Sequence, residues 1–175
     1  TFTGSIGTDI GTVEVVSAGV LDFQGAVTAN GALTVTTSTS ASFGSTVDVL
    51  GATINGNDGV TLDDALTTTG TAVTGAVTID ADANTDGTGT LSLTSAGGGV
   101  DGEVDTATAT SADAPIDITA AAISIASTAN NNMNAGTAAI TITESFGDGI
   151  DLGGAVSGGS ALALSGTELQ NVFTA

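Results

Sequence analysis

Residues 76–93, AVTIDADANTDGTGTLSL, contain the pattern that decides the fold. Two pairs of apolar residues, Val77 with Ile79 and Leu91 with Leu93, each enclose one hydroxyl-bearing residue. Because residues i and i+2 of a strand point to the same face, each pair predicts a short strand with one buried face. The stretch between the pairs is acidic and contains glycine, which is typical of a turn. The sequence therefore predicts a strand–turn–strand unit here.

The same unit recurs along the chain as pairs of apolar residues two apart. The clear pairs are Val13/Val15, Leu33/Val35, Val47/Val49, Val60/Leu62, Val77/Ile79, Leu91/Leu93, Ile116/Ile118, Ile123/Ile125, Ile140/Ile142, Ile150/Leu152 and Leu162/Leu164. The weaker pairs Leu21/Phe23, Val27/Ala29, Ala41/Phe43 and Ala52/Ile54 fill the gaps between them. In the first third they follow too closely for hairpins of ordinary strands, which are about five or six residues long plus a turn. The spacing favours a solenoid with about three sides and about 20 residues per coil, whose coils stack as parallel strands. We therefore predict an all-β fold, a parallel β-helix (β-solenoid) of short strands.

The 175 residues are enough for one domain with a core, and we assign residues 1–175 to a single β-solenoid domain. The rhythm of apolar pairs breaks over residues 94–114, for which we predict an irregular loop region. An immunoglobulin-like β-sandwich is the alternative fold, and it usually has about seven strands with turns about every 8–12 residues. Here the strand signals are closer together, and with five Phe, no Trp and no Tyr the large aromatic core residues are scarce.

The charged residues are all acidic. The chain has 19 Asp and Glu and no Lys, Arg or His, which gives a formal net charge of −19. Without cationic side chains to neutralise phosphates, nucleic-acid binding is excluded. Fixed charge can only repel or be balanced by dissolved cations, so the acidity indicates either cation binding or adaptation to high salt. No apolar run approaches the ~18 residues of a membrane span, and no cysteine is present for disulfides.

Two stretches resemble a known class of surface protein. Residues 25–37, GAVTANGALTVTT, and residues 147–166, GDGIDLGGAVSGGSALALSG, are similar to the repeats of bacterial filamentous-haemagglutinin-like and other β-strand-repeat surface proteins. The resemblance implies a right-handed parallel β-helix that is secreted and displayed as a fibre or an adhesin.

One turn carries a candidate calcium site. Residues 82–87 fit D-x-[DN]-x-[DN]-G, the first half of a calcium loop, with Asp82, Asn84 and Asp86 as oxygen ligands. The closing acidic position of an EF-hand falls on Leu93, so we expect Asp80 to supply the missing ligand instead. The alternative is a solvated turn between two strands.

Two further turns are weaker candidates for calcium. Asn57 and Asp58 lie in one Gly/Asp-rich turn, and Asp148 and Asp151 lie in and beside another. Both resemble the turns of calcium-binding β-rolls, but neither keeps the nine-residue period of those repeats. Ordinary turns are the alternative for both.

The sequence does not indicate an enzyme. The glutamates are scattered, and no aromatic platform for a sugar ring is evident, so a two-carboxylate polysaccharide-active enzyme is only a remote alternative. We predict an extracellular structural protein of the cell surface that forms, or belongs to, a fibre. Strand-like alternation at residues 1–4 and 172–175 predicts self-association head to tail into a filament. The second hypothesis is an adhesin module that binds a host or neighbouring-cell ligand through residues 94–114.

Overall fold

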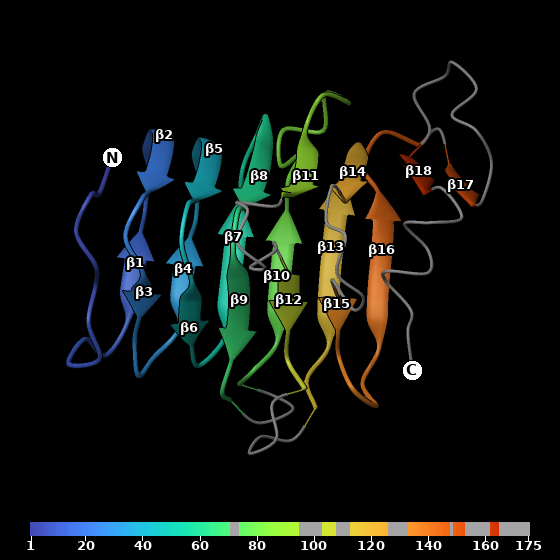
Figure 1. Ribbon diagram of the computed structural model, residues 1–175. Helices are drawn as coiled ribbons and strands as arrows, with labels where there is room; N and C mark the ends of the chain where they lie inside the picture. Colours follow the sequence, from blue (N-terminus) through green and yellow to red (C-terminus); the bar gives the residue numbers. More distant parts are fainter. Residues whose placement is uncertain are drawn as a thin grey trace.

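The protein is built from short strands that stack in three parallel sheets, as the computed structural model shows (Figure 1). The structure describes residues 1–70, 74–94, 103–107, 113–125, 133–147, 149–152 and 162–164. Sheet I contains β1 (Val13–Val15), β4 (Leu33–Val35), β7 (Ala52–Asn55), β10 (Val77–Asp80), β13 (Ile116–Ala120) and β16 (Ile140–Glu144). Sheet II contains β2 (Ala18–Phe23), β5 (Ser38–Phe43), β8 (Gly59–Leu62), β11 (Thr90–Leu93) and β14 (Ala122–Ile125). Sheet III contains β3 (Val27–Thr28), β6 (Val47–Val49), β9 (Ala65–Thr68), β12 (Glu103–Asp105) and β15 (Met133–Asn134).

The chain visits sheets I, II and III in turn, so each trio of strands makes one coil. Among the described strands, β1–β3 make the first coil, and β13–β15 make the last complete one before β16 starts another on sheet I. Strands of sheet I run up the view in Figure 1, and those of sheets II and III run down it. Ahead of β1, Phe2 bridges Phe23 and Ile6 bridges Val27, so the first residues extend sheets II and III by one position.

This arrangement confirms the predicted parallel β-solenoid and makes the sandwich alternative wrong. Every strand pair within the three sheets is parallel, as in β1 with β4 and β10 with β13. An immunoglobulin-like sandwich consists of antiparallel sheets joined by Greek-key connections. Parallel strands instead need a crossover, and here the crossover is the rest of the coil.

The core consists of apolar columns that run along the stack, one residue from each coil. On sheet I, one column contains Val13, Leu33, Ala52, Val77, Ile116 and Ile140, and the other contains Val15, Val35, Ile54, Ile79, Ile118 and Ile142. On sheet II, the ring of Phe2 stacks on Phe23 at 4.8 Å, and Phe23 stacks on Phe43 at 5.3 Å. Apart from this Phe column, the interior consists mainly of small and branched aliphatic side chains.

Hydroxyl groups also enter the core of sheet III, and each is satisfied by a backbone carbonyl. The Thr68 hydroxyl donates to the carbonyl oxygen of Gly75 at 2.6 Å, and that of Thr106 donates to Ala114 at 2.5 Å. Both threonines are buried, so these bonds remove the cost of leaving a polar group unpaired in the interior.

The predicted irregular loop region contains a strand of the solenoid. Within residues 94–114, β12 pairs in parallel with β9 on one side and with β15 on the other. The remaining residues 95–102 and 108–112 lie outside the described part of the chain. The coil therefore continues through this region, with β12 as its sheet III strand.

The last strands, β17 (Ile150–Leu152) and β18 (Leu162–Leu164), pair in parallel with each other, and β18 lies beside β14 (Figure 1). Leu162 and Leu164 are buried, whereas Ile150 is 42% exposed. No described residue belongs to a helix that is long and apolar enough to cross a bilayer.

Candidate functional site

The candidate calcium residues lie at the corner between sheets I and II. The corner of their coil is long, because β10 ends at Asp80 and β11 begins only at Thr90. In the following coil, a single residue, Ala121, separates β13 from β14. The long turn between Asp80 and Thr90 can therefore reach over the short one and contact the coil after it.

Asp82 is the centre of this turn and is fully buried. Its carboxylate accepts hydrogen bonds from the backbone N–H of Gly87 at 3.1 Å and of Gly89 at 3.3 Å. The hydroxyl of Ser145, which directly follows β16, donates a third. The carboxylate thus closes its own turn and connects it to the last strand of sheet I.

The turn has a backbone shape that needs its glycines. A Cβ atom at Gly89 would collide with the carbonyl oxygen of Ala81, and Gly87 has a φ of +80°. At Gly87 the Phe146 ring also lies over the position that a Cβ would take, with the Cγ and Cδ2 atoms both 3.0 Å from it. Ser145 and Phe146 are therefore neighbours of the turn that sequence reasoning missed. No local pattern could have indicated them, since 63 residues separate Ser145 from Asp82.

Asp86 and Asn84 form a second, exposed part of the turn. The Asp86 carboxylate accepts hydrogen bonds from the Thr88 hydroxyl, the Thr88 N–H at 3.0 Å and the Asn84 side-chain amide at 2.9 Å. The Thr88 hydroxyl bond is the main reason why the pKa of Asp86 lies below its usual value.

Asp80 has the opposite electrostatic environment. It lies in register between Asn55 and Thr119 at the end of β10. The pKa of Asp80 lies above its usual value, mainly because the carboxyl group is partly buried. The Asp82 N–H, which donates to the carboxylate at 3.3 Å, lowers the pKa, and the nearby Asp82 charge raises it. Asp80 is the carboxyl group of the turn whose ionisation the fold opposes.

The structure brings the four main candidates, Asp80, Asp82, Asn84 and Asp86, into one turn. The Asn57–Asp58 turn is its neighbour in the preceding coil, because Ala83 N–H donates to the Gly56 carbonyl oxygen at 3.2 Å. Asp148 lies outside the described residues, and Asp151 is on β17 with a side chain that the structure does not describe. In the part of the chain that is described, no three carboxylate, His or Cys side chains are grouped as metal ligands. Calcium binding therefore stays a prediction, to be tested below.

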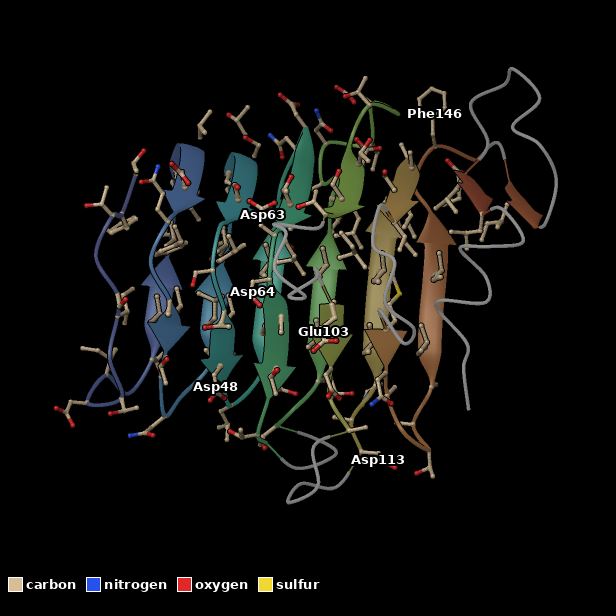
Figure 2. All side chains as sticks on the ribbon, in the orientation of Figure 1. Asp48, Asp63, Asp64, Glu103, Asp113 and Phe146 are labelled. Carbon is tan, nitrogen blue, oxygen red and sulfur yellow. The ribbon has the colours of Figure 1, made fainter. Side chains whose placement is uncertain are left out.

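Other carboxylates are spread along the stack and also hold backbone segments together (Figure 2). Asp63 accepts a hydrogen bond from the Thr94 hydroxyl of the next coil. Asp113 accepts two from Thr137, one from its hydroxyl and one from its N–H at 2.7 Å. These two bonds hold the pKa of Asp113 below its usual value. Figure 2 shows Asp63 and Asp113 far apart, so their bonds join different pairs of coils.

In comparisons with known proteins, no protein-family model, no curated protein and no solved structure matches the chain.

Proposed function

We propose that the chain is a rod-like section of an extracellular structural fibre at the cell surface. The observation that carries the proposal is the uninterrupted stack of coils from β1 to β16, with one apolar core and three parallel sheets. Each coil contacts mainly the coils before and after it, so a stack of this kind can be lengthened without changing its cross-section.

The polar side chains of the turns support a structural role. The buried Asp82 and the exposed Asp113 each bind groups from another coil, and Thr68 and Thr106 satisfy carbonyl groups inside the core. These carboxylate and hydroxyl side chains thus form hydrogen bonds that join neighbouring segments of the chain.

The charge supports a location in a medium that contains dissolved cations. A formal charge of −19 with no fixed cation makes neighbouring rods repel one another side by side. That repulsion keeps fibres separate and hydrated, while the apolar columns hold each rod together along its axis.

The proposal is tested on the native source with antibodies raised against the chain. We expect gold-labelled antibody to decorate fibres outside the cells, and aligned fibres to diffract at about 4.8 Å along the fibre axis, the spacing of stacked strands. Label confined to the cell interior, or fibres without that axial reflection, would contradict the proposal.

A further inference from the structure

The chain contains two Asn-Gly dipeptides, and the fold holds them in different ways. Asn30 and Gly31 lie in the corner between β3 and β4, whereas Asn55 is the last residue of β7 and Gly56 follows it. An asparagine before glycine is a reactive pair, because glycine has no side chain to shield its backbone nitrogen from the amide carbon of the asparagine. Reaction also requires that the peptide link between the two residues can rotate.

The peptide link between Asn30 and Gly31 is not held by a hydrogen bond. Among the described residues, no group donates to the Asn30 carbonyl oxygen, and none accepts from the Gly31 N–H. Asn30 is exposed although a coil lies on each side of its corner. The Asn30 N–H donates to the carbonyl oxygen of Ile10 at 3.0 Å, and the Leu50 N–H donates to that of Gly31 at 3.0 Å. The exposure is therefore a property of this corner within the stack.

The peptide link between Asn55 and Gly56 is held at both of its polar groups. The Ser38 hydroxyl donates to the Asn55 carbonyl oxygen at 2.8 Å. The Gly56 N–H donates to the carbonyl oxygen of Asp80 at 2.8 Å, and Gly56 is buried. Rotation of this link would break both hydrogen bonds, so the fold protects the second dipeptide.

The stack itself requires the glycine of the exposed pair. A Cβ atom at residue 31 would collide with the carbonyl oxygen of Gly11 in the preceding coil. The Asn30 side chain is held by one exposed hydrogen bond, from its amide to the carbonyl oxygen of Thr8 at 2.6 Å. A single hydrogen bond of this kind contributes little net stability, so the amide can leave Thr8 and approach the Gly31 nitrogen.

We propose that Asn30 is a site of spontaneous deamidation in the folded protein, an inference independent of the proposed fibre. The Gly31 nitrogen loses its proton to a base in the solvent and attacks Cγ of Asn30. The new N–Cγ bond closes a five-membered imide, while the Cγ–Nδ2 bond breaks and Nδ2 leaves as ammonia after taking up a proton. Water then adds to one of the two imide carbonyl groups and opens the ring, which leaves aspartate or isoaspartate at position 30. Water is the only co-reactant, and no group is oxidised or reduced.

The product changes the contact with the preceding corner. A carboxylate at position 30 has no N–H to donate, so it places an acceptor against the carbonyl oxygen of Thr8. Thr8 lies in a turn that is closed by a hydrogen bond from the Ile10 N–H to the Gly7 carbonyl oxygen at 3.2 Å. Deamidation therefore adds a negative charge to a chain that has no cationic side chain, and it loosens this turn.

Ageing the natural chain at mildly alkaline pH tests the proposal, with peptic peptides followed by mass spectrometry for the conversion of amide to acid. In the folded protein we expect Asn30 to convert at least about tenfold faster than Asn55, because Asn55 must break two further hydrogen bonds, each worth about fivefold in rate. In urea, where the fold no longer distinguishes them, both dipeptides should convert at similar rates. Folded Asn55 converting as fast as Asn30 would overturn the proposal.

Two controls separate the reaction at residue 30 from general chemistry. Asn84 is also exposed, but Thr85 follows it, so folded Asn30 converting no faster than Asn84 would overturn the proposal too. Asn30→Gln keeps an amide but needs a larger ring, and it should abolish conversion at residue 30 while leaving Asn55 unchanged. Asn30→Asp, the product itself, should melt at a lower temperature than the natural chain. An unchanged melting temperature would show that the turn at Thr8 does not depend on the Asn30 amide.

Discussion

Asp82 is a buried carboxylate in a chain with no basic side chain to balance its charge. Its stabilisation comes from the two backbone N–H groups and the Ser145 hydroxyl that donate to it. Leaving a buried donor without an acceptor costs about 1–3 kcal/mol. We therefore expect Asp82→Ala to lower the free energy of unfolding by about 3 kcal/mol, measured by urea denaturation. Ser145→Ala, which removes only one of the donors, is the control and should cost less. Equal losses for both variants would show that the backbone donors do not depend on Asp82.

Asp80 allows a test of stability against pH. Burial raises its folded-state pKa above the usual value of 3.8, so the folded protein favours the protonated form. Ionised Asp80 therefore opposes folding at pH values above its folded-state pKa, and this effect vanishes below the unfolded value. We expect Asp80→Asn to raise the melting temperature at pH 7 and to leave it unchanged at pH 3.

Asp86 is the matched control for that experiment, with the opposite sign. Hydrogen bonds from Thr88 and Asn84 lower its folded-state pKa. Its ionised form therefore stabilises the fold at pH values above the unfolded-state pKa, and this stabilisation is lost as the pH falls through the folded-state pKa. Asp86→Asn should lower the melting temperature at pH 7. If Asp80→Asn and Asp86→Asn moved the melting temperature in the same direction at pH 7, the electrostatic account of the turn would be wrong.

At the scale of single strands, alternation of apolar residues predicted the elements that have two inward positions. Val77 and Ile79 on β10 are such a pair, and both are fully buried. The sheet III strands β12 and β15 were not predicted, because each has only one inward apolar residue. In β12 only Val104 points inward, and in β15 only Met133 does. A single apolar residue cannot show the alternation that marks a strand, so the sequence does not distinguish these strands from loops.

The register of β7 offers a direct test of which positions face inward. Ile54 is fully buried between Val35 and Ile79, and Thr53, next to it, is exposed between Thr34 and Thr78. We expect Ile54→Asp to lower the free energy of unfolding by roughly 4 kcal/mol, because it buries an unpaired charge. Thr53→Asp should change it by less than about 1 kcal/mol. Similar losses in both variants, measured by denaturant unfolding, would show that the proposed register is wrong.

For the whole molecule, the sequence indicated which acidic residues share the turn after β10 but could not predict how that turn closes. The motif at 82–87 predicted that Asp82, Asn84 and Asp86 would share one turn, and they do. Asp82 is buried and accepts a hydrogen bond from the Ser145 hydroxyl, across an intervening coil whose corner is a single residue. That is a property of how coils of different length stack, and no local pattern encodes it.

The last prediction concerns the response of the whole stack to cations. Two unit charges ~4.8 Å apart repel by roughly 1 kcal/mol even in water, and a charge of −19 has no internal counter-charge. Salt of any kind should therefore raise the melting temperature by screening. A calcium site in the turn between β10 and β11 would add a specific effect, and the exposed oxygen ligands of that turn are Asp86 and the neighbouring Asn84.

We expect calcium to raise the melting temperature further than sodium at equal ionic strength, and Asp86→Ala to remove this difference while leaving the effect of sodium intact. Asp113→Ala is the control, because Asp113 is also an exposed, hydrogen-bonded carboxylate but lies in another turn, beside Thr137. It should keep the calcium-specific increase. At equal ionic strength, only a specific site makes calcium stabilise the protein more than sodium does. Equal stabilisation of the natural chain by both ions would therefore show that calcium acts by screening and that the turn is not a calcium site.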